Sequence, residues 1–159
     1  MPSISRSFRM ASSANDVWGA IFGATYVYPL AMPAHYDAIL VTGRDGLTAG
    51  SIRQITYGYE IAGMVRRATE EITGVDHENR TIDLGFRNDD DIVGTFFRSA
   101  SMVVKVDPNS VGDGPNSRGS NITWTLTYAS DSNGSLNLKK FENATARGFE
   151  TLDAYLMNA

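Results

Sequence analysis

Several features that would point to a particular chemistry are missing from this chain. It has no cysteine, which excludes disulfides, thiolate metal sites and cysteine nucleophiles. It has no apolar run near the length of about 18 residues that a membrane-spanning helix needs, and its first residues (MPSISRSFRM) lack the apolar core of a signal peptide. A net charge of -4 gives no reason to expect nucleic acid or an anionic membrane as a partner. We therefore expect a cytoplasmic protein with no nucleic-acid partner and no membrane insertion.

What is present is the composition of an ordinary globular protein. Apolar residues make up 42% of the chain and charged residues 20%, and 159 residues are enough to bury a substantial core. No internal repeat and no long linker divides the chain. We predict a single domain over residues 1–159 that is a monomer or a weak dimer.

The strongest periodic signal lies at the end of the chain, over residues 138–157. Apolar and small residues recur there at steps of three and four and form one arc of a helix, with charged residues opposite. This pattern predicts a long amphipathic helix packed on a core. The residues of its inner arc are Phe141, Ala144, Thr145, Gly148, Phe149, Leu152, Tyr155 and Leu156.

Almost everything before this helix alternates like short strands joined by turns. Two short helices interrupt the series between the first and second strand. One follows the capping residues 12–16 and ends near Phe22, and the other spans residues 26–32, stopped near Pro29 or Pro33. The predicted strands cover residues 3–10, 36–42, 51–59, 64–75, 80–86, 94–106 and 121–129, with a polar loop at 108–120. We predict an α+β fold in which an antiparallel sheet curves around the terminal helix.

Alternation within four strands selects the residues that face this helix. The inward sets are Arg53, Ile55 and Tyr57; Ile82, Leu84 and Phe86; Ala100, Met102, Val104 and Val106; and Ile122, Trp124, Leu126 and Tyr128. The wall is apolar and aromatic apart from one cation.

Arg53 is therefore the unusual residue, because an inward guanidinium costs several kcal/mol unless it is paired or solvated. Either an inward acid pairs with it, or the interior is wet, or an acidic or carbonyl group of a ligand accepts its hydrogen bonds. Gly148 adds a second open question. It either admits close packing of an aromatic such as Trp124 or helps to leave a cavity.

Other candidate sites have a simpler interpretation. The glycine-bearing segment 43–50 lacks the Gly-Lys-Ser/Thr ending of a phosphate loop and lies between strands, so we interpret it as a hairpin turn. The acidic run 89–91 lacks the pattern of a calcium loop and is interpreted as a solvated turn. His35 and His77 lie in separate turn-like segments, where a solvated or capping role is expected. We predict no metal, no cofactor and no catalytic residue.

The order of these elements and three stretches of sequence resemble a known family. The stretches are GSIRQI at residues 50–55, EITGVD at 71–76 followed by His77 and Asn79, and ETLDAYLM at 150–157. They resemble the plant pathogenesis-related class 10 (PR-10) proteins, the birch-pollen-allergen-like (Bet v 1-like) family of the START-like, helix-grip (SRPBCC) superfamily. The glycine loop departs from the family pattern, because Leu47, Thr48 and Ala49 stand where glycines are usual.

The resemblance implies a seven-stranded curved sheet around the terminal helix and a large cavity for a hydrophobic ligand such as a plant hormone, flavonoid, sterol or alkaloid. The expected ligand contacts are Arg53, Ile55, Tyr57, Ile82, Leu84, Phe86, Met102, Val104, Trp124, Leu126, Tyr128, Thr145, Phe149 and Leu152.

Some relatives are enzymes or receptors, and the resemblance argues against both here. In the norcoclaurine synthases a lysine, a glutamate and a tyrosine do the chemistry; Thr123, Ser99 and Phe97 align with them. The abscisic-acid receptors need a gate loop that segment 58–63 does not match, although its terminal glycines suit a mobile lid.

Three functions remain open for this sequence: a carrier of a hydrophobic ligand, which we favour; an enzyme such as a cyclase or isomerase; and a receptor with a closing lid. No inward carboxylate is evident to serve an enzyme. In the favoured case Arg53 orients the polar end of the ligand, and Arg53→Leu should change ligand affinity or preference.

Overall fold

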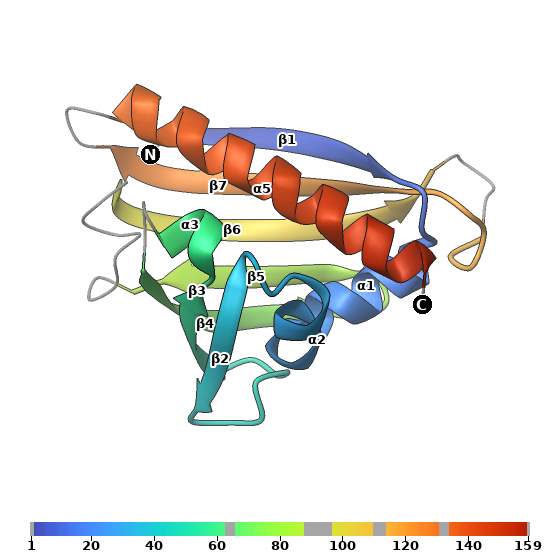
Figure 1. The fold of residues 1–159 in the computed structure, drawn as a ribbon, viewed down its shortest axis with the longest axis horizontal. Helices are drawn as coiled ribbons and strands as arrows, with labels where there is room; N and C mark the ends of the chain where they lie inside the picture. The colour runs from blue at the N-terminus through green and yellow to red at the C-terminus, as the bar shows by residue number, and fades with distance from the viewer. Residues whose placement is uncertain (1, 63–65, 88–96, 110–113, 131–133, 159) are drawn as a thin grey trace.

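A computed structural model describes residues 2–62, 66–87, 97–109, 114–130 and 134–158. Seven strands and four helices follow one another along the described chain (Figure 1). Their order is β1 (Ser3–Met10), α1 (Ala14–Phe22), α2 (Ala24–Ala31), β2 (Tyr36–Thr42), β3 (Ile52–Tyr57), α3 (Tyr59–Ala62), β4 (Arg67–Asp76), β5 (Thr81–Phe86), β6 (Phe97–Pro108), β7 (Ser120–Ser130) and α5 (Gly134–Met157). The predicted turn at 88–91, the start of the predicted sixth strand and part of the 108–120 loop lie outside the described residues.

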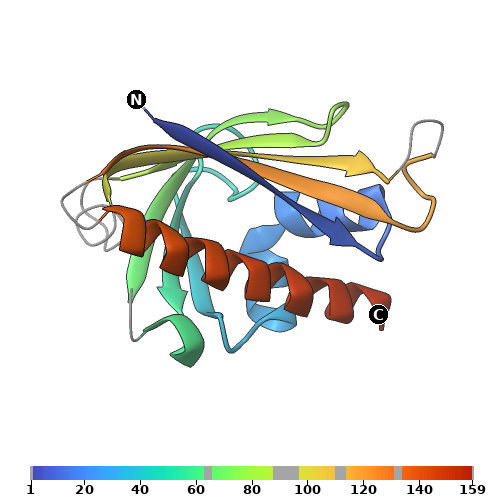
Figure 2. The same cartoon turned by 90° about the horizontal axis from the view of Figure 1, so that it is seen from above.

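The strands form one antiparallel sheet in the order β1-β7-β6-β5-β4-β3-β2. The first two strands of the chain are thus the two edges of the sheet, and α1 and α2 connect them. Figure 2 shows the sheet curving over α5, which runs along its concave side. The predicted α+β helix-grip architecture is confirmed. None of the helices in the described part of the chain combines the length and apolar content that crossing a membrane would require.

The inward faces follow the predicted alternation. Ile82, Ile122 and Trp124 are completely buried, whereas Val103, on the outer face of β6, is 40% exposed. On α5, Leu152 is completely buried. Tyr155, predicted on the same inner arc, is 39% exposed, because the last turn of α5 is not fully covered. The inner arc of α5 is therefore correct except at Tyr155, since Leu156 in the same turn packs against the core.

Several boundaries differ from the prediction. Strand β3 stops at Tyr57 instead of residue 59, and the next residues form the short helix α3. Gly58 explains the break: its N–H donates to the His35 carbonyl (2.7 Å), and a Cβ here would lie 2.5 Å from the Ala34 carbonyl oxygen. Helix α2 runs through Pro29 rather than stopping there, and α5 begins four residues before the predicted start.

The glycine-bearing segment between β2 and β3 is held by its own carboxylate. Oδ1 of Asp45 accepts hydrogen bonds from the N–H groups of Leu47 (2.8 Å) and Thr48 (2.9 Å) and from the Thr48 hydroxyl (3.1 Å). These hydrogen bonds lower the pKa of Asp45 below its ordinary value. An internal anion already occupies these donors, which agrees with a turn rather than a phosphate loop.

Helix α5 is tied to the rest of the fold at two places. Glu142 pairs with Arg6 on β1 (3.1 Å). Nearer the carboxyl end, Asp153 accepts hydrogen bonds from the N–H groups of Ala11 (2.9 Å) and Ser12 (3.0 Å) and from the Ser12 hydroxyl (2.7 Å). These contacts fix the height of α5 above the sheet.

Candidate functional site

A pocket of about 150 Å³ lies between the concave side of the sheet and helices α2, α3 and α5. Its lining is mostly aliphatic and aromatic, with few polar side chains. Strands β2–β6 contribute Tyr36, Ile39, Arg53, Ile55, Tyr57, Glu70, Ile82, Leu84, Phe86, Met102 and Val104, and α5 contributes Lys140, Phe141, Ala144, Thr145, Gly148 and Phe149. Ile21, Ala24, Tyr28, Met32, His35 and Ile61 complete it.

The predicted contact residues divide into two groups. Those that line the pocket are Arg53, Ile55, Tyr57, Ile82, Leu84, Phe86, Met102, Val104, Thr145 and Phe149. Trp124, Leu126, Tyr128 and Leu152 are instead packed in the core beside it. The rings of Trp124 and Phe141 pack in a T-shaped arrangement with their centroids 5.8 Å apart. Phe141 therefore lies between Trp124 of β7 and the pocket. The pocket thus lies toward β3–β6 and away from β7.

Arg53 has a buried partner, Glu70, which settles one of the alternatives left open by the sequence. The two residues face each other directly in the antiparallel register of β3 and β4, and Nη2 of Arg53 pairs with Oε1 of Glu70. Their side chains are only 2% and 9% exposed. The expectation that no carboxylate points inward is therefore wrong. The signal that identifies Glu70 is the alternation of β4, in which Ala68, Glu70 and Ile72 form the buried set.

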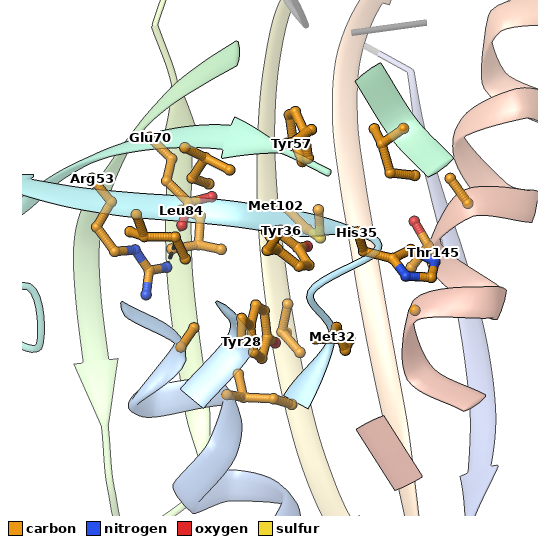
Figure 3. A pocket seen from close by; sticks show the side chains of 18 of the residues that line it. Tyr28, Met32, His35, Tyr36, Arg53, Tyr57, Glu70, Leu84, Met102 and Thr145 are labelled. Carbon is orange, nitrogen blue, oxygen red and sulfur yellow. Dashed lines mark ion pairs between the residues drawn. The ribbon is translucent and has the colours of Figure 1, made fainter. Parts of the chain in front are cut away.

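The ion pair engages only one of the three nitrogens of the Arg53 guanidinium. Among the described residues, no group accepts a hydrogen bond from Nε or Nη1 of Arg53. A buried donor without an acceptor costs about 1–3 kcal/mol, and more on a charged group. Figure 3 shows the pair at one end of the pocket, with Tyr28 and Tyr36 beside it. The arrangement presents a charged donor to whatever occupies this end.

Three tyrosine rings form a row along the pocket. The Tyr28 and Tyr36 centroids are 5.0 Å apart, and those of Tyr36 and Tyr57 are 5.6 Å apart. Burial raises the pKa of Tyr28 and of Tyr36 far above the ordinary value, while the opposite charges of Arg53 and Glu70 act on them in opposing directions. Both phenols are therefore neutral at physiological pH, and they add polarisable surface without adding charge.

His35 lies at the opposite end of the pocket from Arg53, near Thr145 of α5 (Figure 3). It is only 4% exposed, so the expectation of a solvated histidine is wrong. Its short segment carries no periodicity that could have shown its burial. The Thr145 hydroxyl donates to the Phe141 carbonyl within α5 (2.8 Å). His77 is exposed, as expected, and its Nδ1 accepts a hydrogen bond from Nε1 of Trp18 (3.3 Å).

Gly148 faces open space. A Cβ built on it would have no heavy atom within 4 Å, apart from its chain neighbours and the backbone of its own helix turn, and the residue lines the pocket. The alternative in which Gly148 makes room for Trp124 is therefore wrong, because Trp124 packs on Phe141. The missing side chain adds to the volume of the pocket.

Known proteins resemble this chain in sequence and in fold. No family model matches it. It is 27% identical over 146 residues to MLP-like protein 423 of Arabidopsis thaliana, covering 92% of this chain and 88% of the relative. Its fold matches the crystal structure of Ara h 8.0201 with a TM-score of 0.74 at 12% identity over 99% of both chains. The chain has the Bet v 1-like, helix-grip fold.

The fold also matches that of an enzyme. A point mutant of norcoclaurine synthase from Thalictrum flavum, in complex with a transition-state analogue, superimposes with a TM-score of 0.68 at 16% identity, covering 96% of this chain and 94% of the enzyme. Of the positions that align with that family's catalytic groups, Thr123 lies on the outer face, bonded to Ser7 (2.9 Å), and Phe97 is a buried core residue. The charged pair that lines the pocket here is Arg53 and Glu70.

Proposed function

We propose that this chain is an intracellular carrier that binds a hydrophobic small molecule in the pocket between the sheet and α5, with the polar end of the ligand at Arg53. The observation that carries this proposal is the buried guanidinium: two of its nitrogens, Nε and Nη1, find no acceptor among the described residues, in a pocket that is mostly apolar. A ligand with an acceptor at one end and an apolar body satisfies both features at once.

The energetics of the pocket support the same function. Protein interiors are close-packed, and an empty apolar cavity costs about 24 cal/mol per Å³. The pocket of about 150 Å³ is space that larger side chains could fill. Gly148 and Ala144 on α5 leave this space open where larger apolar residues would fill it. A binding function explains why the space is kept.

The relatives support a ligand-binding function without naming the ligand. The norcoclaurine synthase of the same fold was solved with a transition-state analogue, so this architecture accommodates an organic ligand in that protein. The apolar lining here suits the flavonoid, sterol, alkaloid or hormone type of ligand. Shape and the groups around Arg53 would select among them.

Calorimetric titration with 2-acetonaphthone, an aromatic ketone, tests the proposal. The purified protein should bind it with one site, and native mass spectrometry of the same sample should reveal a co-purified small molecule where the pocket is already occupied. Gly148→Leu projects a side chain into the pocket and should abolish binding. Ala154→Leu, on the exposed side of the same helix, is the matched control and should bind as wild type does. Equal binding by wild type and Gly148→Leu would place the ligand elsewhere and overturn the proposal.

A further inference from the structure

The charge of Arg53 is already balanced within the protein. Glu70 lies directly opposite it across the β3–β4 ladder, both side chains are buried, and both line the pocket. A pocket built to hold a carboxylate ligand would need Arg53 as a free cation. Here the protein supplies its own carboxylate, so the site is electrically neutral before any ligand arrives.

A third charge would disturb that balance. An ionised carboxylate placed against Arg53 would also lie near Glu70 and would give the buried site a net negative charge. Moving such an anion out of water is strongly unfavourable unless a cation compensates for it fully. The neighbouring phenols of Tyr28 and Tyr36 carry no compensating charge, and Lys140 lies at the exposed rim, where solvent screens its attraction.

A ligand with a neutral hydrogen-bond acceptor does not change the net charge of the site. The carbonyl oxygen of a ketone, ester, lactone or amide can accept from Nε or Nη1 of Arg53 without adding charge. Hydrogen bonds from charged donors are stronger than those between neutral groups. Nε and Nη1 of Arg53 therefore favour a ligand with a neutral polar group such as a carbonyl, and the Arg53–Glu70 ion pair disfavours an anionic ligand.

We propose that this pocket selects neutral carbonyl-bearing hydrophobic ligands and discriminates against carboxylates, with Arg53 as the hydrogen-bond donor and Glu70 as the residue that sets the charge selectivity. This inference rests on the proposed function, since it names the ligand class of the same pocket.

Three probes with one naphthyl ring test the charge selectivity. They are 2-acetonaphthone, 2-naphthoate and 2-ethylnaphthalene, titrated at about pH 7.5, where the carboxyl group is ionised. The ketone should bind about tenfold more tightly than the hydrocarbon, because it gains a charge-assisted hydrogen bond. The naphthoate should bind at least about tenfold more weakly than the ketone. Naphthoate binding as tight as the ketone would overturn the inference.

Glu70→Gln gives the sharpest test, because it removes the internal counter-charge and keeps the side-chain shape. Naphthoate affinity should rise by about tenfold or more in this variant, while ketone affinity should change by less than about threefold. Unchanged naphthoate affinity in a folded Glu70→Gln protein would contradict the role of Glu70. Arg6→Gln/Glu142→Gln, which neutralises an ion pair outside the pocket, should leave all three affinities unchanged.

A double variant covers the case in which Glu70→Gln does not fold. Arg53→Met/Glu70→Leu replaces the ion pair with apolar groups of similar size, and such replacements are often tolerated. It should still bind 2-ethylnaphthalene, and the ketone should lose its advantage. A retained ketone preference would overturn the inference and the placement of the ligand's polar end at Arg53, while binding of a hydrophobic molecule in the pocket would still stand. If none of the three probes binds the wild-type protein, the proposed function itself fails.

Discussion

Gly148 offers a substitution that should stabilise the protein and reduce its binding at the same time. Glycine inside a helix is less stable than alanine by about 0.5–1 kcal/mol, because the unfolded glycine chain has more conformational freedom. The substitution adds a Cβ to open space, since no atom of a neighbouring element lies within 4 Å of it. Gly148→Ala should therefore raise the free energy of unfolding by about that amount.

Thermal unfolding followed by circular dichroism measures this gain. For a protein of this size, about 1 kcal/mol corresponds to a rise in Tm of roughly 2–4 °C. Gly148→Leu should add up to about 2 kcal/mol more, because its further carbon atoms are buried against the apolar lining. Affinity for 2-acetonaphthone should fall in Gly148→Ala and fall further in Gly148→Leu, because the larger side chain takes up more of the pocket.

Gly19 on α1 is the matched control for the helix effect. A Cβ there also meets no atom within 4 Å, but the residue is exposed and does not line the pocket. Gly19→Ala should stabilise the protein by a similar amount and leave ligand affinity unchanged. If Gly148→Ala lowered Tm, or if Gly148→Leu bound the ketone as wild type does, the space beside Gly148 would not be the binding cavity.

Three further predictions concern polar groups of the fold and the pocket. Asp153→Asn should lower the free energy of unfolding by about 1–3 kcal/mol, measured by urea denaturation, because the carboxylate accepts three hydrogen bonds. Tyr28 and Tyr36 should remain un-ionised as pH passes about 10, because burial raises both pKa values. The two neutral phenols contribute to stability fully below about pH 10, and this contribution is lost as pH rises through their raised folded-state pKa values. The phenolate absorbance of Tyr28 and Tyr36 should therefore develop only with alkaline unfolding. Arg53→Met should destabilise by about 3–5 kcal/mol because it leaves Glu70 buried without a counter-ion, whereas Arg53→Met/Glu70→Leu should unfold at close to the wild-type urea concentration.

Each of these predictions has a control in the same chain. Glu150→Gln removes an exposed carboxylate from the same helix as Asp153 and should leave the urea midpoint unchanged. The chain has seven tyrosines, so phenylalanine at both Tyr28 and Tyr36 should reduce the absorbance step that accompanies alkaline unfolding and leave the step of the exposed tyrosines unchanged. A loss of signal from the earlier step instead would contradict the burial of Tyr28 and Tyr36. Neutralising the exposed Arg6–Glu142 pair should change stability by at most about 1 kcal/mol, far less than breaking the buried pair.

The fold could be predicted because its signals are periodic. Strict alternation in β5, β6 and β7 and the three-and-four spacing in α5 leave few ways to bury the apolar residues. Resemblance to a known family then supplied the topology, which alternation alone does not specify. The predicted strands and helices differ from the structure mainly at their ends, where Gly58 and the short helix α3 depend on close backbone contacts with the segment before β2.

The candidate site was only half predictable. Arg53 stands out because Ile55 and Tyr57, which follow it on the same face of β3, are large apolar and aromatic residues. Alternation also favours Glu70 over Glu71 as an inward residue, because Ala68 and Ile72 lie on either side of Glu70 on its face of β4. Its pairing with Arg53 follows only from the register of β3 and β4. His35 belongs to a short segment without periodicity, so only the tertiary structure reveals its burial.

The position of β1 at the edge of the sheet has a consequence for how the protein is made. Its only partner in the sheet is β7, so Ser3 pairs with Thr127, and Ser5 bonds Thr125 across 120 residues of chain. A ribosome adds about 5–20 residues per second, so β1 waits roughly 6 to 25 s for β7 to be synthesised. During that interval the apolar side chains of Ile4, Phe8 and Met10 have neither β7 nor α5 to cover them. The apolar face of β1 in the nascent chain is therefore open to aggregation until both β7 and α5 have left the ribosome.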